Sequence, residues 1–220
     1  MDDVTRNRIE SFDRCEQWFT DHSAVIGASD KLKTNKNEFV DELALLRTDV
    51  GSQTAAISES EEQTGVKFAS REDGVEIATK VNNAAKAAQI EQPGIQSRYP
   101  YPRGLNDEDF VALLRSYALG GATDEAIIAA YGAPADWVTQ CTAAANDFEA
   151  AGAAQSSAQS EKVGKRASIQ ARVDSLMQRK RTCGYLIENV FAADPAALAS
   201  WKSASHVESP PKKKSPPPTP

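Results

Sequence analysis

Hydrophobic residues recur along two stretches of the chain with the alternating four-three spacing of a packed helix face. The first stretch begins at Phe39 and the second begins 98 positions later, at Trp137. The first seam consists of Phe39, Leu43, Leu46, Val50, Gln53, Ile57 and Ser60, and the second of Trp137, Cys141, Ala144, Phe148, Ala151, Gln155 and Ala158. Each seam predicts a long helix, and their fixed offset indicates an internal duplication.

The same offset relates residues outside the seams, although most other positions differ. These pairs are Phe12 with Phe110, Val40 with Val138, Asp49 with Asp147, Lys67 with Lys165, Ser70 with Ser168 and Val75 with Val173. We therefore interpret the chain as two related helical halves, residues 1–96 and 97–208, packed in one bundle.

In the first half, the apolar spacing predicts helices over 3–26, 37–63 and 67–91. Thr64-Gly65 is interpreted as the turn between the last two helices, because glycine accepts the left-handed conformation at a helix end at little steric cost. These two helices then form an αα-hairpin. The prolines over 93–102 cannot continue a helix, since each lacks a backbone donor and restricts the residue before it.

In the second half, Asn106 is predicted to cap a helix that ends at Gly120-Gly121, and a short helix follows over 123–132. Pro134 is expected to open the second seam helix, because proline suits the first helical position. A second hairpin turn is placed at Gly164.

The last long helix is expected over 166–192, followed by a short helix that begins at Asp194-Pro195. The predicted fold is therefore all-α: an antiparallel helical bundle from two duplicated halves, each with a shorter helix and a long αα-hairpin.

The end of the bundle carries a recognisable pattern, Asp194-Pro195, Leu198, Trp201 and Ser205-His206-Val207-Glu208. It resembles the ending of a group of uncharacterised bacterial all-helical proteins, which have a similar pattern before a variable polar tail. The resemblance covers residues 194–208 and implies no activity. It implies that Trp201 and His206-Val207 are a recurring way of closing the bundle.

Residues 209–220 contain prolines and lysines but no apolar residue, so we expect a disordered tail with polyproline character. Such a tail is typical of a spacer or sorting tag. Its Ser-Pro and Thr-Pro pairs around the lysines also resemble the tails of chromatin proteins.

Composition narrows the class of protein. The 220 residues are 40% hydrophobic but only 7% aromatic, so alanine-rich helices must pack closely over long contacts. The net charge of −6 argues against general nucleic-acid binding. The first residues are acidic and polar, and no window approaches the ~18 uninterrupted apolar residues of a membrane span. We expect a soluble, cytoplasmic protein.

No catalytic, cofactor-binding or metal-binding residue is predicted. The chain has two histidines and no Glu-x-x-His pair, so di-iron, zincin and haem attachment motifs lack their ligands. Cys15 and His22 share a face of one helix, but at seven residues apart they stand roughly 10 Å from each other. Ser205-His206 lie near a flexible end without a third group. The three cysteines are expected to be reduced core residues.

Residues 123–138 resemble a helix-turn-helix, with Gly132 at the turn and Ile127, Tyr131 and Val138 at core positions. No lysine or arginine occurs over 116–161, so this element is not expected to read DNA. Basic residues gather instead at Lys162, Lys165, Arg166, Arg172, Arg179, Lys180 and Arg181, and at Lys212 to Lys214. They form either a solvated helix face or a docking surface for an acidic partner.

The sequence therefore favours a non-enzymatic interaction or structural module that binds a protein partner or a second copy of itself. The alternatives are a carrier of a small apolar ligand between alanine-lined helices and an enzyme of unrecognised type. A carrier should show a dry pocket walled by the seam residues, whereas a module should show an exposed apolar or charged stripe.

Overall fold

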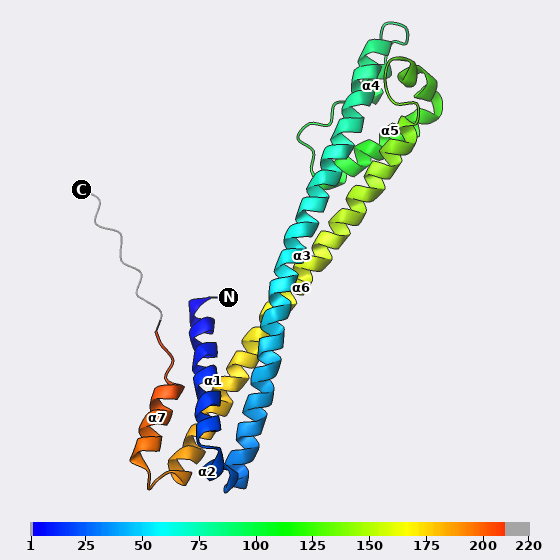
Figure 1. The fold of residues 1–220 in the computed structure, drawn as a ribbon. Helices are drawn as coiled ribbons and strands as arrows, with labels where there is room; N and C mark the ends of the chain where they lie inside the picture. Colours follow the sequence, from blue (N-terminus) through cyan, green and yellow to red (C-terminus); the bar gives the residue numbers. More distant parts are fainter. Residues whose placement is uncertain (1, 210–220) are drawn as a thin grey trace, which may run out of the picture. The chain divides into compact units, whose positions relative to one another are not determined.

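The computed structural model describes residues 2–209, and within this range it contains helices and connecting segments but no strand. The predicted all-α fold is confirmed. The predicted tail, apart from Ser209, lies outside the described residues. The helices of the described range are α1 (Asp3–Asp21), α2 (Ser23–Gly27), α3 (Asp30–Ala88), α4 (Ile95–Arg98), α5 (Asp107–Ala130), α6 (Trp137–Val190) and α7 (Pro195–Ser205) (Figure 1).

The two predicted hairpins are wrong. Helix α3 continues through Gly65 and helix α6 continues through Gly164, each without interruption. Both glycines keep helical backbone angles, and no side chain approaches either of them. A glycine weakens a helix by only about 1 kcal/mol, which packing along the flanking turns overcomes.

The chain divides into two compact units. Unit 1 is made of Met1–Ala55 and Val163–Pro220, and unit 2 is made of Ala56–Lys162. This division differs from the predicted halves 1–96 and 97–208, because each unit combines one part of α3 with one part of α6. The internal duplication stays a prediction.

In unit 1, the first part of α3 and the last part of α6 run antiparallel, with α1 and α7 beside them (Figure 1). Arg179 of α6 forms an ion pair with Glu42 of α3 at 2.8 Å. Arg172, seven residues before Arg179, forms an ion pair with Asp49, seven residues after Glu42. The core of this unit is aromatic and aliphatic. It includes Phe12, Phe19, Phe39, Leu43, Leu46, Val173, Leu176, Cys183, Ile187 and Trp201.

In unit 2, the last part of α3 and the first part of α6 run antiparallel, with α5 packed on both (Figure 1). Ser60 donates a hydrogen bond to Gln159 at 3.0 Å, and Lys67 donates one to Gln155 at 3.1 Å. Residues further along α3 therefore contact residues earlier in α6, as in an antiparallel pair. The core of this unit contains Val81, Ile95, Tyr99, Phe110, Leu114, Tyr117, Ile128, Trp137, Cys141 and Phe148.

Two helix starts agree with the sequence. Asn106 caps α5 by accepting from the Asp109 N–H at 2.8 Å, and Asp194 caps α7 by accepting from Ala197 at 3.0 Å. Helix α1 ends earlier than expected, at Asp21, and α2 follows it after His22.

The predicted break at Gly120-Gly121 is also wrong, because α5 continues through both residues to Ala130. A Cβ atom on Gly120 would lie 2.7 Å from the Tyr99 hydroxyl, and one on Gly121 would overlap Val138 Cγ2. These glycines therefore allow close packing rather than ending the helix. The turn falls instead at Gly132, which has a φ of 100°.

Candidate functional site

A groove on the surface of unit 2 brings apolar side chains together with charges of both signs. Its volume is about 420 Å³, and it lies between α5 and α6 with one side chain from α3. The lining residues are Lys67, Asp107, Glu108, Val111, Ala112, Arg115, Phe148, Glu149 and Gly152.

The groove follows from helical periodicity. On α5 the lining residues fall at intervals of three and four, from Asp107 to Arg115, so they share one face over roughly 12 Å. On α6, Phe148 and Gly152 are one turn apart in the same way. Because Gly152 has no side chain, the groove stays open between the two helices.

The floor of the groove is apolar and firmly packed. Phe148 is 3% exposed, and its ring meets that of Phe110 edge to face, with 5.4 Å between the ring centroids. The Lys67 ammonium and the Arg71 guanidinium lie 5.6 Å and 5.7 Å from the Phe148 centroid. Such contacts hold both cations over the ring. The floor is therefore a preformed surface.

Ion pairs form the rim. Asp107 pairs with Lys67 at 2.6 Å and with Arg71 at 2.7 Å, and Arg115 pairs with Glu149 at 2.5 Å. The hydrogen bond from Lys67 is the main cause that lowers the pKa of Asp107, so this carboxylate stays ionised. Glu108 forms no ion pair with any residue of the described range. The rim therefore keeps one unpaired negative charge.

An apolar floor and a charged rim are the usual parts of a protein interface. The groove contains no cysteine, serine or histidine that could act as a nucleophile or general base. Its titratable side chains are those of Lys67, Asp107, Glu108, Arg115 and Glu149.

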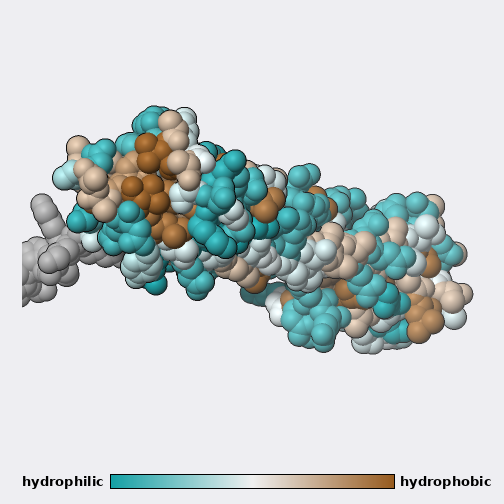
Figure 2. All heavy atoms as spheres, turned by 90° about the horizontal axis from the view of Figure 1, so that it is seen from below, coloured by the Kyte–Doolittle hydropathy of each residue, from teal (hydrophilic) through white to brown (hydrophobic). Residues whose placement is uncertain are grey.

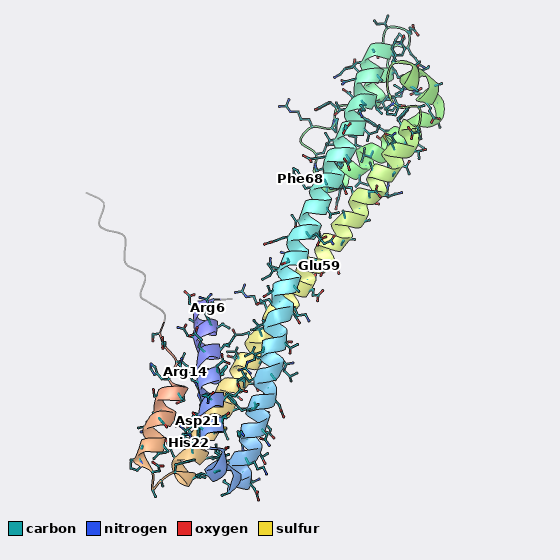
Figure 3. All side chains as sticks on the ribbon, viewed as in Figure 1. Arg6, Arg14, Asp21, His22, Glu59 and Phe68 are labelled. Carbon is teal, nitrogen blue, oxygen red and sulfur yellow. The ribbon has the colours of Figure 1, made fainter. Side chains whose placement is uncertain are left out.

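Unit 1 exposes apolar atoms at the end that carries α2 and the connection from α6 to α7 (Figure 2). Val25 is 45% exposed there, whereas Phe191 is 4% exposed. In unit 2, Phe68 projects from α3 and is 64% exposed (Figure 3). Exposed apolar residues of this kind are normal on protein surfaces, so they add no site.

Part of the basic run on α6 makes contacts inside unit 1. Arg172 pairs with Asp49, while Arg179 pairs with Glu38 and Glu42. These contacts join α6 to α3. Lys180 is 7% exposed and donates to Ser11 Oγ and to the Ser205 carbonyl. Three of the seven basic residues therefore pack within unit 1, whereas Lys162, Lys165, Arg166 and Arg181 form no ion pair within residues 2–209.

Cys15 lies on α1 and His22 directly follows this helix, and the two residues have separate roles. Cys15 is fully buried, and burial raises the pKa of its thiol to about 12, so it remains protonated at neutral pH. His22 stacks on Trp18, and its Nδ1 lies 2.9 Å from the Trp18 carbonyl oxygen. Burial also raises the pKa of Cys141 and Cys183 to about 12. All three thiols are free core residues.

The residues of the resembling C-terminal pattern hold the end of the chain on unit 1. Trp201 is 5% exposed and belongs to the core, while His206 is exposed. Arg14, labelled on α1 in Figure 3, donates to the His206 carbonyl at 2.6 Å. Asn7 donates to the Glu208 carbonyl at 2.8 Å. These contacts use main-chain atoms, and the imidazole of His206 takes no part in them.

The helix-turn-helix resemblance covers the end of α5 and the start of α6. Ile128 and Trp137 are fully buried there, and Ile127, Tyr131 and Val138 pack against the core of unit 2. The element therefore packs within the unit.

Within residues 2–209, no group of three or more histidine, cysteine, aspartate or glutamate side chains is arranged to hold a metal ion. No helix of this range combines the length and apolar character that a membrane crossing requires. Comparisons with protein-family models, curated proteins and solved structures give no significant match to the chain.

The sequence predicted no site, so the groove was missed. Phe148 was assigned to a seam, and Asp107 and Glu108 to the first turn of a helix. A turn at Gly65 would have placed Lys67 on a separate hairpin arm. The available signal was the alternation of acidic, apolar and basic residues at helical spacing from Asp107 to Arg115.

Proposed function

We propose that the protein is a non-enzymatic interaction module that binds an amphipathic helix of a partner protein in the groove of unit 2. The observation that carries this proposal is the preformed floor of Phe148 and Val111 bordered by ion pairs. A groove of this kind accepts a helix through apolar anchors spaced by three or four residues.

The rim charges favour a particular partner. Asp107 pairs with Lys67 and Arg71, and Glu149 pairs with Arg115, so the one rim carboxylate without an ion pair in the described range is that of Glu108. The remaining negative charge favours a lysine or arginine beside the apolar face of the partner helix. Such a contact would mainly increase the rate of association and fix the register of the two helices.

Site-specific photocrosslinking in the native host tests this proposal. A photoreactive amino acid at Ala112 lies in the groove, and one at Leu119 lies on the same helix, 80% exposed and outside the groove. We expect one discrete crosslinked protein from position 112 and none from position 119. A variant that carries only the Ala112→Arg substitution should no longer co-purify with the crosslinked protein. Equal crosslinking at both positions would overturn the proposal.

A second candidate is a carrier of a small apolar ligand, because the groove has an apolar floor and a volume within the range of small-molecule sites. Most seam side chains are buried, and those of Phe39, Leu43 and Trp137 are fully buried. The groove is therefore the place for such a ligand. Native mass spectrometry separates the candidates, since a carrier should retain a stoichiometric small molecule that an Ala112→Arg variant loses.

A further inference from the structure

A second pocket of unit 2 lies between the end of α3 and the connection that carries α4. Its volume is about 420 Å³. One wall consists of Asn82 and Lys86, which lie one turn apart on α3, and of Gln89, which directly follows the helix. Pro100 and Tyr101 line the opposite wall. None of these residues belongs to the groove described above.

Asn82 gives the pocket a buried hydrogen-bond acceptor. Its side chain is 2% exposed, and its Nδ2 donates to the Tyr99 carbonyl at 2.6 Å. This bond fixes the orientation of the amide. The Oδ1 atom has no hydrogen-bond partner among residues 2–209. Leaving a buried amide oxygen without a donor is unfavourable, and most buried polar atoms in proteins have a partner.

Gln89 and Lys86 give the pocket donors and a positive charge. Gln89 Oε1 already accepts from the N–H groups of Gly94 and Gln96, each at 3.1 Å. The part of its amide that remains for a ligand is therefore the NH₂ group. Lys86 is exposed and forms no ion pair within the described range. Its Nζ lies 5.9 Å from the ring centroid of Tyr101.

The pocket therefore combines an acceptor at its inner wall, a cation at its mouth and an aromatic side wall. Its lining contains no carboxylate. A ligand that placed an ammonium group against Asn82 would bury a charge without a counter-charge, which is costly. The group that meets Asn82 is instead a neutral N–H, and the group that meets Lys86 is an anion.

We propose that this pocket binds a small carboxylate that carries an amide N–H, of the class of N-acylated amino acids. The amide N–H donates to Asn82 Oδ1, and the carboxylate pairs with the Lys86 ammonium. An apolar or aromatic side chain of the ligand packs on the ring of Tyr101, which is 50% exposed.

Three related ligands test the two contacts. N-acetylphenylalanine carries both groups, 3-phenylpropionate lacks the amide, and the methyl ester of N-acetylphenylalanine lacks the charge. Each is titrated into the full-length protein and followed by the backbone amide resonances. We expect N-acetylphenylalanine to shift resonances over 82–101 and to bind at least about fivefold more tightly than the other two, a difference of about 1 kcal/mol.

A matched pair of variants tests the charge. Lys86→Gln should weaken binding of N-acetylphenylalanine by about fivefold and leave binding of its methyl ester unchanged. Lys80→Gln alters another exposed lysine of α3, which pairs with Glu76 outside the pocket, and should change neither. Asn82 is probed through the ligands because its replacement would also release the Tyr99 carbonyl.

The proposal is overturned if N-acetylphenylalanine causes no shifts at about 10 mM, because a dissociation constant above this concentration is weaker than that of an ordinary ligand. It is also overturned if the three ligands bind equally, if Lys86→Gln has no effect, or if the shifts map to the groove of Phe148 and Val111.

Discussion

The two units solve the same packing problem with different chemistry. In each, a polar side chain buried on a long helix donates to a main-chain carbonyl of the segment that returns along that helix. In unit 1, Lys180 donates to Ser205 at 2.8 Å, and in unit 2, Asn82 donates to Tyr99 at 2.6 Å. Lys180 and Asn82 are 98 positions apart, which is the offset of the two seams.

The donors differ in how completely they are satisfied. The Lys180 ammonium also donates to Ser11 Oγ at 3.2 Å and lies 5.6 Å from the ring centroid of Phe12. Burial lowers the pKa of Lys180, because it disfavours the charged form. The Asn82 amide is neutral and avoids that cost, but it leaves Oδ1 without a protein partner.

The units also close their cores differently. Unit 1 uses aromatic contacts, in which the Trp18 ring centroid lies 5.1 Å from that of Trp201 and 5.3 Å from that of Phe191. Unit 2 combines aromatic contacts with hydroxyl groups. Tyr99 donates to the buried Asp124 at 2.8 Å, and Tyr117 donates to the Pro100 carbonyl. The comparison shows that a helical unit accepts either closure.

The aromatic closure predicts the largest single effect. Trp201→Ala should lower the free energy of unfolding by about 3–5 kcal/mol, because it removes a buried tryptophan from the core of unit 1. Denaturant unfolding measures this loss. Tyr185→Ala, at a position 69% exposed on α6, is the control and should change stability by no more than about 0.5 kcal/mol. Similar losses in both variants would contradict the aromatic closure.

Alkaline pH should destabilise both units through their thiols. Burial raises the pKa of the three cysteine thiols from an ordinary value of 9.0 to about 12, so the folded state keeps protons that the unfolded state loses. The contribution of these thiols to the free energy of unfolding is complete below pH 9 and is lost as the pH rises toward 12. Each thiol should remove about 1 kcal/mol per pH unit in this window.

Unfolding by denaturant at a series of pH values above 9 checks this prediction. Cys141→Ala in unit 2 and Cys183→Ala in unit 1 should each reduce the slope of stability against pH. Lys180 acts in the opposite direction in unit 1, since its lowered folded pKa makes stability rise with pH below 10.5. An unchanged slope in both cysteine variants would show that the thiols are not protected.

The hydroxyl closure of unit 2 predicts a smaller effect. Tyr99→Phe should cost about 1–3 kcal/mol of unfolding free energy, because Asp124, 1% exposed, loses a hydrogen-bond donor. Asp124 keeps its ion pair with Arg98 at 2.9 Å, which limits the loss. Tyr185→Phe removes an exposed hydroxyl and should leave the midpoint of unfolding unchanged. Equal midpoints for both variants would rule out the structural role of the Tyr99 hydroxyl.

The smallest effects concern the mid-helix glycines. Gly65→Ala in unit 2 and Gly164→Ala in unit 1 should each stabilise the protein by about 0.5–1 kcal/mol, since alanine favours a helix and finds open space. Gly121→Ala should destabilise it, because the added Cβ would overlap Val138. Thermal melting distinguishes these signs. If both Gly65→Ala and Gly164→Ala destabilised the protein, the result would favour the turns predicted from the sequence over continuous helices.

The sequence predicted the fold class and several helix ends because those depend on local chemistry. Asn106 and Asp194 cap helices as their side chains suggest. The pairing of elements was not predicted, because a glycine that ends a helix and one that lies within it look alike in a single sequence. A signal for continuity was present, since the four-three spacing passes through Gly65 in phase. It runs over Ser60, Thr64, Lys67, Arg71, Gly74, Ala78 and Val81.

The groove and the pocket could not be predicted for a related reason. Both join residues distant along the chain, such as Lys67 with Gly152, and Asn82 with Tyr101. Their placement depends on how α3 lies against α5, α6 and the connection between α3 and α5. The unpaired state of Asn82 Oδ1 is a three-dimensional property that no residue pattern reports.

The division of the chain has a consequence for its synthesis. Unit 2 is one continuous segment, Ala56–Lys162, whereas unit 1 is assembled from both ends of the chain. On the ribosome, where synthesis proceeds from the N-terminus, α1 and the start of α3 emerge first and must wait for α6 to be completed. During that interval Phe12, Phe19 and Phe39 lack Val173, Leu176 and Trp201, their later core partners. The nascent chain therefore keeps these aromatic side chains without their core partners until the last part of α6 and α7 have been made.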